Sequence, residues 1–464
     1  MNNISHKITA LLFLVPAIAY GQNGLSSGSA EDPNRKILYG FVRGGFYGSI
    51  DDSDYKLYVP SAYSDLALKL DAGDGEHFKG YADLRYRYGT EFREPVSRLD
   101  LREAYVTVNG KKWDISAGQK IIKWGRADFT NPTQKLSPQN LISRSMDHED
   151  MDMANLLIDG RWYPSPLISI EADIIPFYRP SVLIIKPIKL PSYIMINQNE
   201  SLVTDKKMFT YGLRADLHLK GIDFGVSWFD GYDPMQGVAL TGVSLDTTGY
   251  IPAFAAELDM TPYKIRNLGF DFETALGNFG IRGEAAWTFP YLSYKTNEYV
   301  PLEEIKWVAG IDWMKGNWRI TGEYSGKTIP GFEPSPVEPA LLAEPDPAVL
   351  ALLMSIPGFS LADYMHQQVG AFNRLYNYQM EQFYHSGGIR VETDLFYGKL
   401  TPSVTALYNF TSRDLMLMPE VIYKPFDGLT IAAGGEFLSG RKSSVYDIVD
   451  EFMNCFKIGM KVNF

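Results

Sequence analysis

Apolar and polar residues alternate with a period of two along much of the chain. The clearest case is the segment 208–220, in which Leu213 and Leu217 fall on one face and Arg214 and Asp216 on the other. Successive side chains of a β-strand point to opposite faces, so this pattern predicts strands that have one apolar and one charged face. We expect about 18 such strands (16–18). Their approximate spans are 38–50, 62–72, 77–90, 98–110, 112–123, 154–163, 166–178, 207–220, 222–231, 264–277, 279–292, 303–314, 317–328, 381–397, 399–412, 414–426, 428–440 and 453–464.

The connections between the expected strands are mostly short and long in alternation. The short ones lie at 73–76, 110–111, 164–165, 221, 278, 315–316, 398 and 427, and the long ones at 51–61, 124–153, 179–206, 232–263, 293–302, 329–380 and 441–452. Near Arg102 and Glu103 the alternation slips by one residue, which predicts a β-bulge. Short periplasmic turns and long extracellular loops are typical of outer-membrane barrels. The pattern therefore predicts an all-β fold, a single transmembrane antiparallel β-barrel.

The first 21 residues have the pattern of a secretory signal peptide. Lys7 precedes the ten-residue apolar run 10–19, and the small residues Ala19 and Gly21 fit a cleavage site. Ten apolar residues are too few to cross a bilayer, which takes roughly 20. We expect residues 1–21 to be removed, 22–36 to form a short periplasmic segment, and 37–464 to form the barrel.

The last strand carries a more specific signal. Phe456, Ile458, Met460, Val462 and Phe464 occupy every second position, and the chain then stops. This resembles the C-terminal assembly signal of Gram-negative outer-membrane barrels. The resemblance implies a place in the outer membrane among its lipids, and recognition of the Phe464 strand by the barrel-assembly machinery.

The composition agrees with a barrel and argues against a nucleic-acid-binding protein and a disulfide-stabilised fold. Aromatic residues make up 14% of the chain, which suits girdles at the two membrane interfaces. The net charge of −11 argues against binding to nucleic acid. Cys455 is the single cysteine, so no internal disulfide can form. The expected interfacial aromatics are Tyr86, Tyr88, Trp113, Trp162, Trp313 and Trp318.

Charged residues on the polar strand faces are the candidate pore lining, because a barrel of this size leaves an aqueous lumen unless something fills it. The arginines could draw anions inward or could pair with the acids to brace the wall. His218 shares this face, although a lone histidine is more often structural. The predicted pore-lining residues are Asp83, Arg85, Arg87, Asp100, Arg102, Arg214, Asp216, His218, Arg282, Glu284, Arg319, Glu323, Arg390 and Glu392.

The segment 118–140 resembles a stretch found in bacterial porin-like barrels. The residues that carry this resemblance are Gly118, Gln119, Trp124, Gly125, Asp128, Pro132 and Pro138. It implies a porin-like channel and a loop that turns into the pore. The same loop continues with four acids, Asp147, Glu149, Asp150 and Asp152. They could form a solvated loop, meet the basic wall at a constriction, or hold calcium through oxygen ligands.

The connection 329–380 contains an apolar, helix-prone run at 348–356. Protein surfaces rarely expose a contiguous apolar run unless it binds or packs against something. It could plug the pore, cap an apolar entry site, touch the outer leaflet, or pack against neighbouring loops.

The HExxH zinc motif and the phosphate-binding glycine loop are absent, and the expected barrel, residues 37–464, contains no GxSxG nucleophile elbow. The sequence therefore predicts no enzyme, no catalytic residues, no metal and no cofactor. We expect a channel for passive diffusion of small solutes, with anion preference as a further hypothesis. The alternative is a gated channel for hydrophobic molecules, which resembles long-chain fatty-acid transporters; a surface barrel with a filled lumen is a third reading. The oligomeric state is left open.

Overall fold

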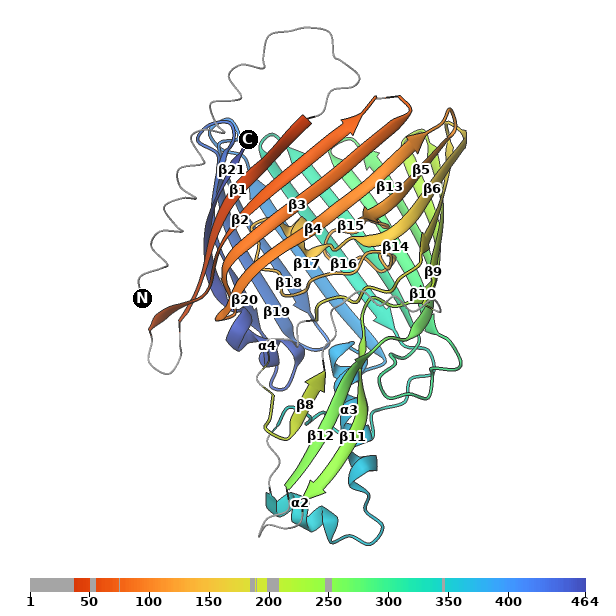
Figure 1. Ribbon diagram of the computed structural model, residues 1–464, viewed down its shortest axis with the longest axis vertical. Helices are drawn as coiled ribbons and strands as arrows, with labels where there is room; N and C mark the ends of the chain where they lie inside the picture. The colour runs from red at the N-terminus through yellow and green to blue at the C-terminus, as the bar shows by residue number, and fades with distance from the viewer. Residues whose placement is uncertain are drawn as a thin grey trace.

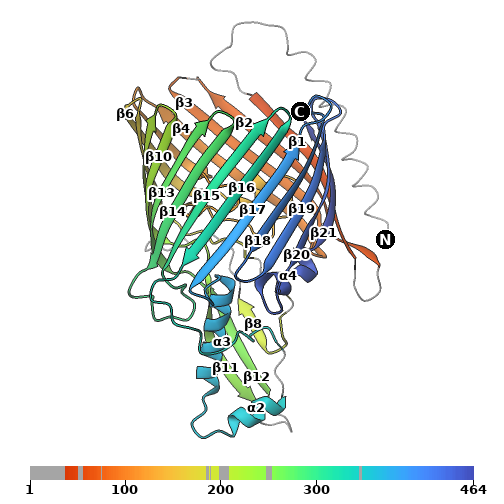
Figure 2. The same ribbon diagram turned by 180° about the vertical axis from the view of Figure 1, so that it is seen from behind.

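The computed structural model describes residues 37–50, 56–74, 76–183, 188, 190–197, 208–246, 253–343 and 347–464. Within these residues, one antiparallel sheet of 18 strands closes into a barrel (Figures 1 and 2). The strands, in the order in which they pair around the barrel, are β1 (Ile37–Ile50), β2 (Leu57–Gly73), β3 (Phe78–Glu91), β4 (Glu94–Asn109), β5 (Trp113–Lys120), β6 (Asn155–Ser165), β7 (Ile168–Ile175), β9 (Thr210–Leu219), β10 (Ile222–Tyr232), β13 (Lys264–Leu276), β14 (Phe279–Pro290), β15 (Glu304–Lys315), β16 (Trp318–Thr328), β17 (Phe383–Thr393), β18 (Leu400–Asn409), β19 (Asp414–Tyr423), β20 (Leu429–Ser439) and β21 (Cys455–Asn463). The predicted fold class and strand number are confirmed.

The last strand closes the ring against the first. Val42 of β1 lies opposite Val462 of β21. Beyond the last assigned residue, Gly40 and Phe464 exchange two main-chain hydrogen bonds of 2.9 and 3.0 Å. A Cβ at Gly40 would lie 2.0 Å from the carbonyl oxygen of Ala67, so only glycine fits between the neighbouring strands. A sheet that spans a lipid bilayer must have no unpaired edge, and the closed ring meets this requirement.

The barrel strands alternate in burial as the sequence pattern predicted. In β9, Tyr211 and Leu213 are exposed on the outer face, whereas Thr210 and Arg214 are buried on the inner face. The exposed tryptophans Trp113, Trp162 and Trp318 lie next to the short turns, as expected for an interfacial girdle. The slip near Arg102 is confirmed as an irregularity in the β3–β4 register, where Glu103 pairs with Asp83 and Leu101 with Leu84.

Several predicted strand ends are corrected. β4 begins at Glu94 rather than 98, because Phe92 and Arg93, both with positive φ, make a two-residue turn. β5 ends at Lys120 rather than 123, because the chain leaves the wall there for the lumen. Further differences of three or more residues lie at the starts of β2 and β9 and at the ends of β7, β17, β18 and β19. The predicted signal peptide and the segment 22–36 lie outside the described residues and stay predictions.

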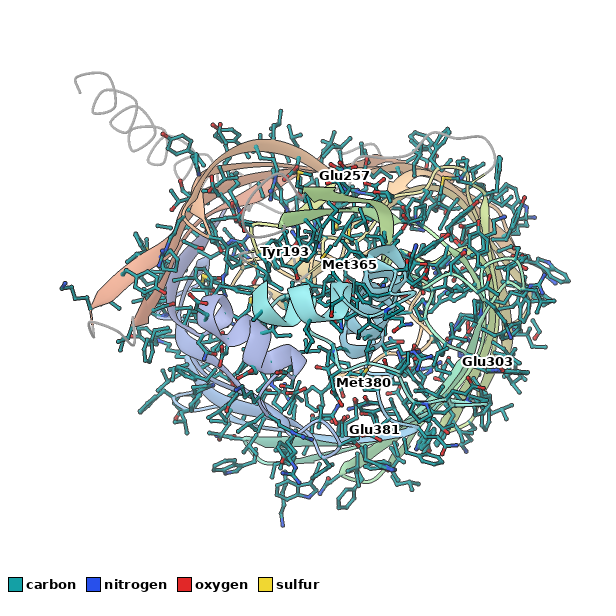
Figure 3. The ribbon with its side chains drawn as sticks, turned by 90° about the horizontal axis from the view of Figure 1, so that it is seen from below. Tyr193, Glu257, Glu303, Met365, Met380 and Glu381 are labelled. Carbon is teal, nitrogen blue, oxygen red and sulfur yellow. The ribbon has the colours of Figure 1, made fainter. Side chains whose placement is uncertain are left out.

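A folded protrusion stands at the barrel end that is opposite the short turns (Figures 1 and 2). Its sheet has β8 (Ile194–Asn197), β11 (Gly237–Asp246) and β12 (Ala253–Thr261), and α3 (Leu361–Tyr376) packs on that sheet through Met365, Val369 and Phe372. The predicted connections 179–206 and 232–263 are thus not plain loops. Seen along the barrel axis, Met365 and Tyr193 lie near the middle of the outline (Figure 3).

The apolar run at 348–356 is divided between α2 (Pro347–Met354) and the turn that follows. Figure 1 shows α2 at the far tip of the protrusion, away from the lumen. Leu352 and Ile356 are exposed there. Neither a plug nor a contact with the outer leaflet fits this position, whereas α3 from the same connection packs against neighbouring loops. A further helix, α4 (Val445–Met453), packs on β20 through Val449 and Met453. Among the described residues, no helix is both long and apolar enough to cross a membrane.

Candidate functional site

The connection between β5 and β6 folds into the barrel. Lys120 and Asn155 are paired neighbours on the two strands, so residues 121–154 leave the wall and return to it at the same place. We call these residues the lumen segment. They contact inner-wall side chains of β1 and β3 on one side of the barrel and of β14 and β16 on the other. The implied loop that turns into the pore is confirmed.

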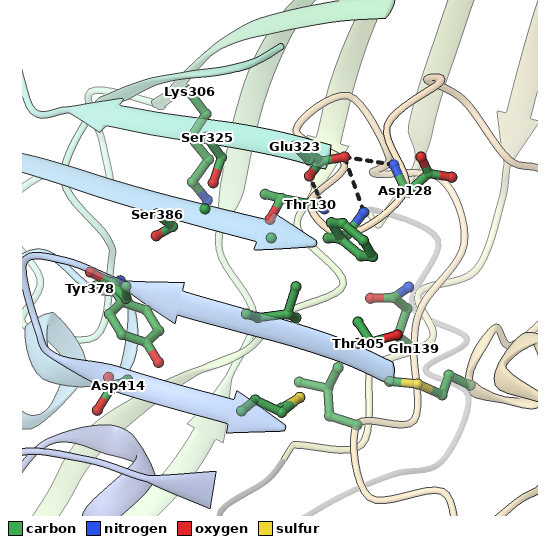
Figure 4. Close-up of a pocket in the computed structure, with 18 of the residues that line it drawn as sticks. Asp128, Thr130, Gln139, Lys306, Glu323, Ser325, Tyr378, Ser386, Thr405 and Asp414 are labelled. Carbon is green, nitrogen blue, oxygen red and sulfur yellow. Dashed lines mark hydrogen bonds between the residues drawn. The ribbon is translucent and has the colours of Figure 1, made fainter. Parts of the chain in front are cut away.

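Two carboxylates of the inner wall hold the first part of the lumen segment through its backbone. Glu284 of β14 accepts N–H groups from Arg126, Ala127 and Thr133, at 2.9, 3.2 and 2.8 Å. Glu323 of β16 accepts N–H groups from residues 128, 129 and 130, at 2.9, 3.2 and 3.0 Å (Figure 4). Charge-assisted bonds of this kind are stronger than neutral ones. The two glutamates therefore fix the path of the segment across the lumen.

Arg126 extends this anchor to the neighbouring wall. Its Nε donates to the fully buried Asp271 at 2.7 Å, and its Nη1 donates to Glu273 at 3.0 Å. Asp271 also accepts from Arg214 of β9, at 2.7 and 2.9 Å. The same arginine contacts Asp216 at 2.7 Å. Bracing, which was one of the two roles considered for the lumen arginines, thus describes Arg214.

The acidic part of the lumen segment meets the opposite, basic wall. Asp150 lies 2.8 Å from Arg43 and 2.7 Å from Arg85, and Asp147 lies 3.0 Å from Arg43 and 2.8 Å from Lys461. The reading of these acids as a loop that meets the basic wall is supported, and the reading as a free solvated loop is wrong for these two residues.

The remaining residues of this stretch make different contacts. Arg102 donates to the main-chain carbonyl of Glu149 at 2.5 Å, while the Glu149 side chain is exposed. Asp152 pairs with Lys123 of the segment itself at 2.7 Å. These contacts add a third arginine to the wall that holds the acidic stretch.

The ion pairs of Asp150 predict resistance to acid. Burial alone would raise the pKa of Asp150, but Arg43, Arg85 and the Ser145 hydroxyl lower it more, so that this pKa lies below its usual value. A depressed folded-state pKa means that the pairs stabilise the segment above the unfolded pKa of about 3.9 and are lost only as pH falls through the lower value. We expect constant single-channel conductance between pH 7 and about pH 4.5. A conductance step in this range that Asp150→Asn abolishes would contradict the assignment.

Sequence reasoning missed two arginines that organise this wall. Arg43 is almost fully buried and bonds Asp65 as well as the lumen segment. Arg144, within the segment, donates to the main-chain carbonyl of Phe452 at 2.8 Å and contacts Cys455 at 3.4 Å. Arg43 was hidden because Tyr47 shares its inner face and blurs the alternation of apolar and polar residues.

The main cavity lies between the lumen segment and the later strands of the barrel. Its volume is about 1410 Å³. Figure 4 shows Asp128 and Gln139 of the lumen segment, with Lys306, Glu323, Thr405 and Asp414 on the wall strands. The charged residues that line it are Asp128, Lys135, His148, Asp233, Glu304, Lys306, Arg319, Glu323, Lys327, Arg390, Glu392, Asp394, Asp414, Lys424 and Glu436.

The predicted lining residues divide into three groups. Arg319, Glu323, Arg390 and Glu392 line the main cavity. A second group holds the lumen segment or braces the wall beside it, and comprises Asp83, Arg85, Arg87, Arg102, Arg214, Asp216, Arg282 and Glu284. Asp100 pairs with Arg98, and His218 pairs with Asp223 beside a short turn, so neither reaches the main cavity.

The molecule is a closed barrel with an in-folded segment and a polar cavity beside that segment. Several solved structures share this fold. Acinetobacter baumannii OccAB2 matches with a TM-score of 0.54 and 9% identity over 94% of this chain and 99% of that one. Pseudomonas aeruginosa OccK3 (OpdO) matches with 0.52 and 10% over 92% and 95%, and P. aeruginosa OccD3 (OpdP) with 0.51 and 10% over 94% and 95%.

No family model and no curated protein sequence matches the chain. At identities near 10% the structural likeness is one of fold. That fold is a closed antiparallel β-barrel of 18 strands.

Proposed function

We propose that this protein is an outer-membrane channel for passive diffusion of small polar solutes. The observation that supports it best is the polar cavity inside a closed 18-stranded wall. Its charged lining favours water and polar solutes over apolar ones. The Phe464 strand remains our predicted signal for the assembly machinery, and removal of residues 1–21 remains our expectation for export.

We further propose a preference for anions, because at two points of the cavity lining two cations share one carboxylate. Arg319 and Arg390 share a single carboxylate, that of Glu392, which is 2.8 Å from Arg390. Both arginine side chains are about half exposed, at 51% and 41%, whereas the Glu392 side chain is 9% exposed. The charge that faces lumen water at this point is therefore positive.

At a second site on the same wall, two lysines likewise share one carboxylate, although only Lys306 of the two is partly exposed. Lys306 and Lys327 share Glu304, at 2.6 and 3.3 Å. Positive charge in a water-filled cleft with low-dielectric walls raises the local concentration of anions. The hydrophobic alternative was motivated by the apolar connection 329–380. Its apolar run at 348–356 lies at the tip of the protrusion (Figure 1), so this run does not support an apolar pore.

Solute passage is tested by swelling of liposomes that contain the purified protein. We expect swelling in small sugars and organic anions at rates that fall with solute size. Liposomes that swell no faster than protein-free ones with every polar solute would contradict the proposal.

The anion preference is tested by reversal potentials of planar bilayers in a KCl gradient. We expect the wild type to favour chloride, and Arg319→Ala combined with Arg390→Ala to lower the chloride-to-potassium permeability ratio roughly two- to five-fold, because two exposed cations leave the lumen. Arg98→Ala is the matched control, since Arg98 is 46% exposed and does not line the main cavity. A wild type that favours potassium would remove the anion preference while leaving the channel function intact.

A further inference from the structure

Three acidic side chains meet on the inner wall beneath the lumen segment. Asp159 of β6 lies directly across from Asp173 of β7, and Glu171 of β7 lies across from Arg161. Carboxylate oxygens from Asp159, Glu171 and Asp173 all lie within 4.8 Å of one another, and all three residues are buried. The cluster is separate from the main cavity and from the contacts that anchor Asp147 and Asp150.

The available cations do not neutralise this cluster. Lys120 contacts Asp159 at 2.5 Å, and Arg161 contacts Glu171 at 3.1 Å and Asp159 at 3.5 Å. Three carboxylates therefore face two bases. The excess negative charge is buried, where an unpaired charge is most costly.

Asp173 is the member of the cluster that no base contacts among the described residues. It is 1% exposed, and neither Oδ1 nor Oδ2 has a hydrogen-bond partner among the described residues. Oδ1 of Asp159 likewise accepts no hydrogen bond there. Buried polar atoms are almost always satisfied, so the two open oxygens of Asp173, beside an Asp159 Oδ1 whose only base is Arg161 Nε at 3.5 Å among the described residues, indicate a missing ligand.

The lumen segment covers the cluster. The Trp124 indole N–H donates to Glu171 at 3.0 Å. The same ring packs over Gly212, which pairs with Asp173, so closely that a Cβ at Gly212 would lie 2.8 Å from it. The cluster is thus enclosed between the wall and the indole ring, which shields it from the lumen.

We propose that Asp159, Glu171 and Asp173 bind a calcium ion. Calcium takes 6–8 oxygen ligands at 2.3–2.6 Å in irregular geometry, so two oxygens on one ion lie at most about 5 Å apart, as these do. Magnesium requires a near-ideal octahedron at shorter distances, which three carboxylates fixed on two rigid strands do not supply. The ion would supply the positive charge that the cluster lacks and would tie β6 and β7 together.

The test uses the full-length protein in detergent micelles after removal of metal with a chelator. Calorimetric titration with CaCl₂ is expected to show one bound ion per chain, and titration with MgCl₂ weaker binding. Terbium should bind at the same place and emit on excitation of tryptophan, because Trp124 lies against Glu171. Calcium should quench this emission by competition.

Asp173→Asn keeps the shape of the side chain and removes its charge. We expect this variant to bind calcium at least about tenfold more weakly and to lose the terbium emission. Calcium should raise the thermal unfolding temperature of the wild type and leave that of the variant unchanged. Asp312→Asn is the matched control, because Asp312 is also an inner-wall acid but contacts Arg282 and Thr321. If Asp173→Asn does not fold, Asp159→Asn carries the same expectation.

No saturable calcium binding by the wild type would overturn the proposal and would point to a proton held by the cluster instead. Equal binding by the wild type and Asp173→Asn would also overturn it, as would tighter binding of magnesium than of calcium. None of these readouts measures solute passage, so the result is independent of the channel function.

Discussion

Replacement of residues 121–154 by a two-residue Asn-Gly turn is expected to leave the barrel folded and to raise its single-channel conductance several-fold. Lys120 and Asn155 are adjacent partners in the β5–β6 ladder, so a hairpin turn can join them without moving either strand. Conductance rises because the segment that crosses the lumen is gone, and a barrel of 16–18 strands is otherwise wide enough for an aqueous channel.

The deletion also removes the hydrogen-bond partners of buried acidic side chains on the inner wall. Asp271, Glu284 and Glu323 lose their contacts with the segment, and the apolar cluster around Trp124 and Leu136 is lost. In the emptied lumen these groups would be hydrated rather than buried, so their charge is tolerated. We therefore expect a lower thermal unfolding temperature but a closed barrel by circular dichroism.

The control for this deletion is replacement of α2, residues 347–354, by a glycine-serine linker of the same length. Because α2 lies at the tip of the protrusion, the conductance should stay at the wild-type value (Figure 1). An unchanged conductance after loss of residues 121–154 would show that the narrowest point of the channel lies elsewhere.

The wall was predictable because lipid on one side and water on the other impose a two-residue period on every strand. The same constraint located the bulge, since one extra residue at Arg102 shifts the phase of the alternation. The protrusion escaped prediction for a related reason. β11 and β12 are sheet strands too, but Val238 and Leu258 face α3 instead of lipid, and nothing in their pattern separates them from the loops that surround them.

The partners inside the lumen were less predictable than the wall. The inner positions of Glu284 and Glu323 follow from the alternation, and we expected them to pair with arginines. The structure shows that their main partners are backbone N–H groups of residues 126–133, and such donors are present in every sequence except at proline. The resemblance of segment 118–140 to porin-like barrels indicated that a loop enters the pore, but not which wall groups receive it.

The double variant Glu284→Gln and Glu323→Gln tests these backbone contacts directly. Each glutamine keeps one carbonyl oxygen and replaces the other by an amide N–H₂, which would face backbone donors. A hydrogen bond to a charged group contributes about 1.5–3 kcal/mol, so the loss of several such bonds loosens residues 126–133 by several kcal/mol. We expect the open channel to fluctuate between sublevels, with a mean conductance between those of the wild type and the barrel that lacks residues 121–154.

The partial effect follows from the two-sided attachment of the lumen segment. Asp147 and Asp150 still hold its later part against Arg43 and Arg85, so the segment should move without leaving the lumen. Glu273→Gln is the matched control, because Glu273 contacts only the Arg126 side chain among the described residues and is half exposed. If the double variant opened to the wild-type conductance without sublevels, the contacts of Arg43 and Arg85 alone would fix the segment. The carboxylates of β14 and β16 would then not be needed to hold it.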